Sequence, residues 1–189
     1  MNISEIGPMQ IIMIIGVAVL LAASIAVLLF NRQRRTQKLQ AQFGNAEYSR
    51  TLKADGSRRQ AESSLDKRAE RVDKLHIRPL APGDRARFVE SWARVQAHFV
   101  DGPGSAVTEA DQLLGDVMST KGYPMSDFEQ RVADISVDHP LVLDSYRAAH
   151  QGALRHTRGE ASTEDLRKAM LHFRTLFEEL IREPEPSRP

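Results

Sequence analysis

The sequence predicts an all-α protein with three parts: a single N-terminal transmembrane helix, a helical stalk, and a small bundle of four or five helices. An uncharged apolar stretch lies near the N-terminus, and beyond it apolar residues recur at intervals of three and four. No segment alternates apolar and polar residues with β-branched enrichment, so no sheet is expected. The expected segments are a short N-terminal segment 1–8, the transmembrane helix 9–30, the stalk 31–81, the bundle 82–182 and a disordered tail 183–189.

The apolar stretch 9–30 has the length of a membrane span. Its 22 residues, at about 1.5 Å each in a helix, extend over roughly 33 Å, enough for the hydrocarbon core of a bilayer. A cleaved signal peptide is the alternative, but residues 1–31 contain no Lys or Arg. The trace of a cleavage site, Ser24-Ile25-Ala26, is followed by four more apolar residues. A retained anchor is therefore the favoured interpretation.

Charge next to the span predicts its orientation. The basic residues Arg32, Arg34, Arg35 and Lys38 follow the span, whereas Glu5 is the one charged side chain before it. Basic residues favour the cytoplasmic side, so we expect a cell-membrane protein with its N-terminus outside and its C-terminal domain in the cytoplasm. The same four residues are predicted to contact anionic lipid headgroups. A solvated connector would carry similar charges, and both interpretations stay open.

The charge of the remaining chain divides unevenly. Residues 31–80 hold 13 basic and 6 acidic side chains, whereas residues 81–189 hold 13 basic and 18 acidic ones. A basic connector is thus followed by an acidic distal domain. The chain has no cysteine, which excludes disulfides, thiolate metal sites and cysteine catalysis.

The stalk contains two predicted helical runs. The first is the polar run from Gln33 to Phe43, for which Gly44 is the expected stop. The second covers 57–75 and has one narrow apolar stripe, made of Ala61, Leu65, Ala69, Val72 and Leu75. This stripe is compatible with a short coiled-coil seam between two copies or with packing on its own domain.

Five helical segments are predicted in the bundle. They begin near Pro82, at Ser105, at Asp127, at Pro140 and near Ser162, and the second closes at Gly122-Tyr123-Pro124. Ser126 and Glu129 are spaced as a capping box for the third. Trp92 is in phase with the apolar face of the first segment, which predicts a core position. Tyr123, after a helix-stop glycine, is expected to fold back onto its own domain.

One group of side chains in the bundle has the composition of a metal site. Asp127, Glu129, Asp134, Asp138 and His139 form the densest group of carboxylates and imidazole, and a divalent ion accepts such ligands. Helix capping explains the same residues, because acids near a helix N-terminus are stabilising. Capping is the favoured interpretation, and no cofactor is predicted.

The chain contains no catalytic signature. His150 and His156 lie six residues apart and therefore on different faces of a helix. Phosphate loops, zinc-protease pairs and nucleophile elbows are absent from the sequence. Nucleic-acid binding is not expected either, since acids interleave with the basic residues of the stalk and aromatic residues are few.

These observations favour two hypotheses of function, and an enzyme comes third. The first is a membrane-tethered interaction or scaffolding module for an unknown membrane-associated protein. The second is a membrane-attached sensor that binds a small ligand or metal ion in the bundle. Alanines at 18, 22 and 26 repeat every four residues in the span, which permits close helix approach and a possible homo-oligomer.

Three segments carry a resemblance to a known group of proteins. They are the stalk motif FGNAEY (43–48), the segment SRRQAE (57–62), and the stretch GYPMSDFEQRVADISVDHPLVLDSYRAAH (122–150). They resemble segments of an uncharacterised bacterial family with one N-terminal span. The resemblance implies bacterial origin and the layout given above, with no activity, ligand or catalytic residue attached.

Overall fold

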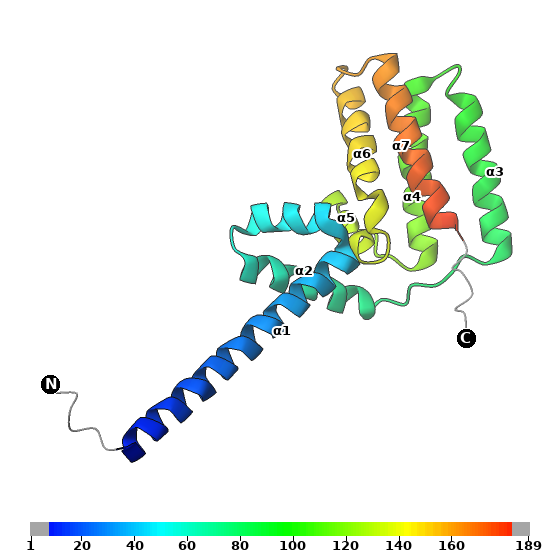
Figure 1. Cartoon of the computed structure of the whole chain (residues 1–189). Helices are drawn as coiled ribbons and strands as arrows, with labels where there is room; N and C mark the ends of the chain where they lie inside the picture. Colours follow the sequence, from blue (N-terminus) through cyan, green and yellow to red (C-terminus); the bar gives the residue numbers. More distant parts are fainter. Residues whose placement is uncertain (1–7, 183–189) are drawn as a thin grey trace.

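The computed structural model describes residues 8–182, and within that range it contains helices and no strand (Figure 1). The all-α prediction is confirmed. The helices are α1 (Pro8–Asp55), α2 (Arg58–Asp73), α3 (Pro82–His98), α4 (Pro103–Lys121), α5 (Phe128–Asp138), the short 3₁₀ turn η2 (Pro140–Val142), α6 (Leu143–Thr157) and α7 (Thr163–Ile181). The predicted tail 183–189, and the N-terminal segment up to residue 7, lie outside the described residues.

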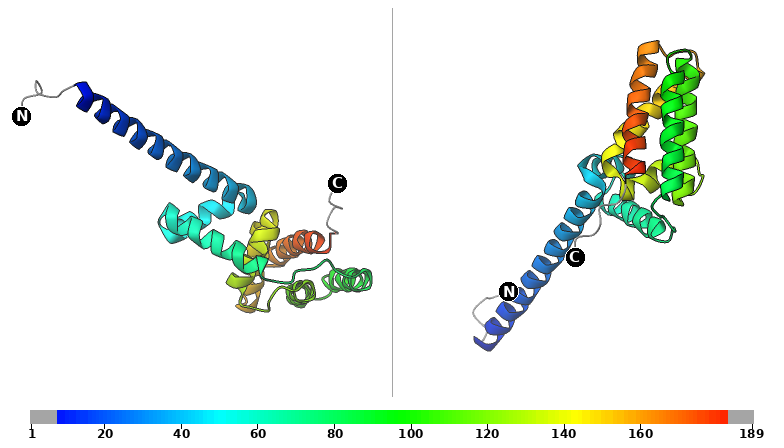
Figure 2. Two further views of the ribbon diagram at one scale, coloured as in Figure 1. Left: turned by 90° about the horizontal axis from the view of Figure 1, so that it is seen from below. Right: turned by 90° about the vertical axis from the view of Figure 1, so that its right-hand side faces the viewer.

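The first half of α1 projects away from the rest of the molecule as a single rod (Figures 1 and 2). Within the described residues, α1 is the one helix long and apolar enough to cross a membrane. Its apolar window has a mean hydropathy of 1.6, and none of that window is buried. A core helix of a soluble domain would bury such residues. The apolar surface of this rod therefore has no partner within the described chain.

Gly44 bends α1 sharply. Its backbone angles are φ 75° and ψ 157°, a region that is essentially restricted to glycine. The prediction that a helix stops at Gly44 is thus correct locally, although helical structure resumes at once and continues to Asp55. The chain then turns at Gly56, also at positive φ, and α2 returns against α1. We call the segment 31–73 the hairpin.

The hairpin has a small hydrophobic core of its own. Leu39, Phe43, Tyr48 and Leu65 are buried together, with Ala69 packed against them. Ala61 and Val72 of the same α2 stripe are also buried. The stripe of α2 therefore packs within its own chain, which is the second of the two interpretations of this pattern.

The larger core lies among the distal helices. α7 packs against α6 and α4, and α4 packs against α3 and α6, so that these four helices lie side by side (Figures 1 and 2). Trp92 is buried, and its ring stacks on Phe177 with 4.8 Å between the ring centroids. The predicted core position of Trp92 is confirmed.

The ends of the helices are capped by polar side chains, and one predicted cap differs from the structure. The predicted capping box of Ser126 and Glu129 is wrong, because Asp127 is the N-cap of α5 and accepts a hydrogen bond from the Gln130 backbone N–H at 2.9 Å. Ser162 instead forms a full capping box with Asp165 at the start of α7. The segment at Pro140 begins as a 3₁₀ turn before α6.

The loop after α4 agrees with the sequence expectation. Gly122 adopts a left-handed conformation at the end of α4. Tyr123 folds back into the core, and its hydroxyl donates to Asp138 at 2.7 Å. Burial and the neighbouring Asp138 carboxylate raise the pKa of Tyr123 far above its usual value, so this hydroxyl stays a donor. The loop thereby ties α4 to the end of α5.

Substitution of Gly44 tests the importance of the bend. Gly44→Ala adds a Cβ atom to a backbone conformation that disfavours it, and we expect a loss of about 1–3 kcal/mol in the free energy of unfolding. Urea unfolding of the full chain in detergent micelles measures this loss. Gly83→Ala in α3 is the matched control, since its φ is not positive and nothing lies within 4 Å of the added atom. Equal stability of the two variants would contradict a required bend.

Candidate functional site

Buried carboxylates lie within the hairpin and where the hairpin meets the distal helices. Three carboxylates there are almost removed from water: Glu47 is 3%, Glu62 is 7% and Asp134 is 0% exposed. They come from α1, α2 and α5 respectively. A buried carboxylate is tolerated only when paired and hydrogen-bonded. We call the region around these three residues the junction.

Glu62 joins the two arms of the hairpin. Its Oε1 accepts hydrogen bonds from the Thr36 hydroxyl at 2.5 Å, the Tyr48 hydroxyl at 3.2 Å and the Arg58 guanidinium at 3.0 Å. Burial by itself would raise the pKa of Glu62, but these donors together hold it below its ordinary value. Thr36 and Tyr48 lie on opposite sides of the Gly44 bend, so one carboxylate links the bent helix to α2.

Glu47 joins the hairpin to the distal helices. Arg68 of α2 lies 2.8 Å from its Oε1, and Arg147 of α6 lies 2.9 Å from its Oε2. Burial would raise the pKa of Glu47, yet the ion pairs with Arg147 and Arg68 lower it below its ordinary value. Three helices therefore meet at one ionised side chain.

Asp134 supplies the second connection to the distal helices. Its Oδ1 accepts a hydrogen bond from Arg71 Nε of α2 at 3.0 Å and one from the Gln130 side chain at 3.1 Å. An exposed ion pair at 3.0 Å between Arg50 and Asp144 adds a contact between α1 and α6. Because exposed pairs contribute little, Glu47 and Asp134 are the main polar contacts between hairpin and bundle.

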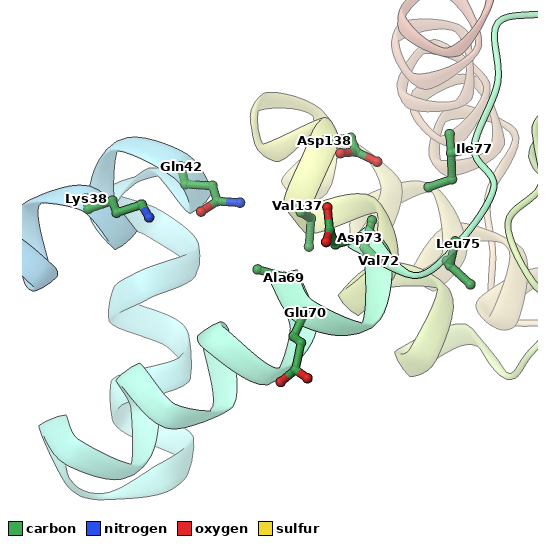
Figure 3. A pocket seen from close by; sticks show the side chains of 10 residues that line it. All are labelled: Lys38, Gln42, Ala69, Glu70, Val72, Asp73, Leu75, Ile77, Val137 and Asp138. Carbon is green, nitrogen blue, oxygen red and sulfur yellow. The ribbon is translucent and has the colours of Figure 1, made fainter.

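A groove of about 650 Å³ opens beside the junction. Lys38 and Gln42 of α1 stand on one side of it, and Val137 and Asp138 at the end of α5 stand opposite (Figure 3). Residues of the second half of α2 and of the segment after it complete the lining. The groove is therefore formed by parts of the chain that are far apart in the sequence.

The five predicted metal candidates do not form one site. Among the described residues, no group of three or more His, Asp or Glu side chains is arranged to hold a metal ion. Each candidate has its own place: Asp127 caps α5, Glu129 lies exposed in its first turn, Asp134 binds Arg71, Asp138 accepts from Tyr123, and His139 lies 3.1 Å from Glu179. Asp134, Asp138 and His139 thus connect α5 and its end to other segments, whereas Asp127 and Glu129 lie at the start of α5.

The four predicted lipid-contact residues follow the apolar rod along α1. Arg32, Arg34, Arg35 and Lys38 are all exposed. The Arg34 guanidinium lies 4.3 Å from the centre of the Phe30 ring, and Arg35 pairs with Asp66 of α2. Lys38 lines the groove. Two of the four thus also have partners that the sequence did not reveal.

A second cluster of buried polar side chains lies within the distal helices. It contains four of the buried side-chain atoms that have no hydrogen-bond partner in the described structure: Asp111 Oδ1, Arg131 Nε, the Tyr146 hydroxyl and His150 Nδ1. Burial lowers the pKa of His150 and raises that of Tyr146, which favours the neutral form of both groups. The Phe128 ring stacks on the His150 ring.

No family model, curated protein or solved structure matches this chain. The geometry of the junction nevertheless gives a physical meaning to the motif FGNAEY. Phe43 and Tyr48 are in the hairpin core, Gly44 makes the bend, and Glu47 is the buried carboxylate. The sequence shows this motif, but it does not predict that Glu47 and Glu62 are buried. The one sequence feature that points to their burial is the presence of acidic residues among apolar residues in a basic segment.

Removal of the Glu47 charge is expected to weaken the junction. Glu47→Gln leaves Arg68 and Arg147 partly buried without a counterion, and we expect a loss of about 3 kcal/mol in the free energy of unfolding. Glu90→Gln, at an exposed position of α3, is the control and should change it by less than about 0.5 kcal/mol. Urea unfolding of both variants in detergent micelles provides the comparison.

The same pair of variants tests the pH dependence. The pKa of Glu47 is lower in the folded than in the unfolded chain, so its contribution to stability is present above the ordinary glutamate pKa of 4.5 and is lost as the pH falls through the folded-state pKa. The unfolding free energy of Glu47→Gln should therefore fall less steeply in acid than that of the parent. Parallel acid profiles would contradict a stabilising ionised Glu47.

Proposed function

We propose that this protein is a single-span membrane protein that presents a helical interaction or scaffolding module at the cytoplasmic face. One observation carries the proposal: an apolar helix with none of its apolar window buried continues without interruption into a hairpin that buried charges join to the bundle. A bilayer would cover the apolar surface that the chain itself leaves exposed.

The junction supports a defined geometry between anchor and module. A flexible linker would let the bundle sample many orientations, whereas Glu47 and Asp134 link α1 and α2 to α5 and α6. Restriction to the membrane plane raises the effective concentration of a module for a partner in the same membrane. A fixed orientation adds to this effect, because fewer encounters present the wrong surface.

The charge distribution supports the proposed orientation. Arg32, Arg34 and Arg35 lie exposed directly after the apolar stretch, at the level expected for headgroups. Basic residues are retained on the cytoplasmic side, and anionic lipids attract them by about 1 kcal/mol per residue near the surface.

Thiol labelling tests the anchor and its orientation. The chain has no cysteine, so Asn2→Cys and Lys53→Cys each introduce a single thiol. In intact cells a membrane-impermeant maleimide should label Asn2→Cys and not Lys53→Cys, and lysis should expose both. Labelling of Lys53→Cys in intact cells would contradict the proposed topology, and recovery of the protein from the soluble fraction would contradict the anchor.

The interaction role has a separate test. In-cell crosslinking of the full chain, followed by mass spectrometry, should identify a defined membrane-associated protein that is lost when residues 9–30 are replaced by a soluble linker. A self-crosslink alone would instead indicate a homo-oligomer. Absence of any crosslinked protein, under conditions in which the chain is in the membrane, would contradict scaffolding.

One observation favours a second candidate function, the binding of a small polar ligand among the distal helices. The unpartnered atoms of Asp111, Arg131, Tyr146 and His150 come from α4, α5 and α6. The charges of Asp111 and Arg131 act on both Tyr146 and His150, so these side chains lie near one another. Buried polar groups need partners, and a ligand or ordered water would supply them.

Native mass spectrometry separates these two occupants. A bound ligand should appear as a discrete added mass on the full chain released from detergent, and Arg131→Gln should lose that mass. Gln151→Ala, an exposed change on α6, is the control. The protein mass alone in both samples would leave water as the occupant and contradict ligand binding.

A further inference from the structure

The groove beside the junction lies close to the proposed membrane surface. Lys38, on its edge, follows Phe30 by eight residues in an uninterrupted helix. At about 1.5 Å per residue, this places Lys38 roughly 12 Å along the helix axis from the end of the apolar stretch. The headgroup region occupies about 5–8 Å on each side of the hydrocarbon core. The groove therefore begins just beyond the headgroups, and this position rests on the proposed membrane anchor.

The lining of the groove combines acidic and apolar side chains. Glu70 and Asp73 of α2 and Asp138 of α5 contribute three carboxylates, against the single ammonium group of Lys38. Glu70 pairs with Lys74 at 2.8 Å, and Asp138 accepts from Tyr123, whereas Asp73 lies exposed at the end of α2.

Apolar side chains lie between these carboxylates. Val72, Ile77 and Val137 come from α2, the following linker and α5, and all three line the same opening (Figure 3). Burial of apolar surface provides affinity, while the surrounding charge selects the partner. The groove thus suits a segment that is both apolar and basic.

Charge disfavours two other occupants. Anionic headgroups would meet the carboxylates of Asp73 and Asp138, beside Glu70 in its pair with Lys74, and like charges in contact are destabilising. The sequence after Arg182 contains Glu183 and Glu185 with a single Arg188, so the C-terminal residues are a poor electrostatic match too. A basic partner is attracted by the groove carboxylates, whereas anionic headgroups and the acidic C-terminal residues are repelled by them.

We propose that this groove docks the basic, amphipathic juxtamembrane segment of a neighbouring membrane protein. Segments of this kind are enriched in Lys and Arg within about 15–20 residues of a span on its cytoplasmic side. Such segments lie at the same height above the bilayer as the groove, so a partner segment can reach it by diffusion in the membrane plane. This partner class extends the proposed interaction function by naming its surface and chemistry.

A photo-crosslinking experiment in neutral lipid tests the proposal. The full chain carrying Gln42→Cys, labelled with a benzophenone maleimide, is placed in phosphatidylcholine nanodiscs. The probe is a palmitoylated dodecapeptide of Arg, Leu and Ser, and its matched control has Glu in place of each Arg. A label on Gln151→Cys, exposed on α6, reports crosslinking away from the groove.

We expect the Arg peptide, and not the Glu peptide, to crosslink at position 42. The double variant Glu70→Gln/Asp73→Asn should lower the yield about fivefold, since two exposed charges each contribute modestly. Glu90→Gln/Asp101→Asn removes two exposed acids elsewhere and should leave the yield unchanged. Higher salt should reduce the yield, as expected for exposed charges.

Four results would overturn the inference. They are equal yields for the Arg and Glu peptides, an unchanged yield in the groove variant, capture of phosphatidylglycerol when that lipid is added, and capture of a second copy of this chain without peptide. Failure of the chain to enter the nanodiscs is a different outcome, because it contradicts the membrane anchor on which the position of the groove depends.

Discussion

A carboxylate almost fully removed from water must keep its positive partners, and Glu47 keeps Arg68 of α2 and Arg147 of α6 at 2.8 and 2.9 Å. The desolvation of an ion is compensated only when such partners are held in place. Glu47 therefore constrains the positions of three helices at once. The bent α1, the returning α2 and α6 are thereby in contact through one side chain.

The bend at Gly44 determines where that pairing can form. A straight α1 would carry Glu47 farther along the axis of the rod, whereas the glycine-only backbone conformation at Gly44 redirects the helix so that Glu47 lies beside Arg68 and Arg147. Thr36 before the bend and Tyr48 after it then bind the same Glu62 carboxylate. The contacts of Glu62 and Glu47 consequently join the apolar rod to the bundle. They fix the position of the groove relative to the end of the rod.

Apolar periodicity and helix-terminating residues account for most of the correct predictions from the sequence. The helical class, the exposed apolar helix, the stop at Gly122 and the core position of Trp92 all follow from local spacing and backbone preference. The capping box at Ser126 was wrong because the neighbouring Asp127 accepts the same kind of bond one position later. Asp134 and Asp138 are metal candidates only through their proximity in the sequence, and in the fold they contact Arg71 and Tyr123.

The sequence by itself determined the elements that need only local information: an apolar stretch of bilayer length, amphipathic helices, and glycine at the positions of positive φ. Tertiary structure decided which charges are buried and what they bind. Glu47, Arg68 and Arg147 are separated by up to a hundred residues of chain, and nothing in their local spacing distinguishes them from solvated surface charges. Burial depends on the packing of distant segments, so the junction and its groove exist only in the folded molecule.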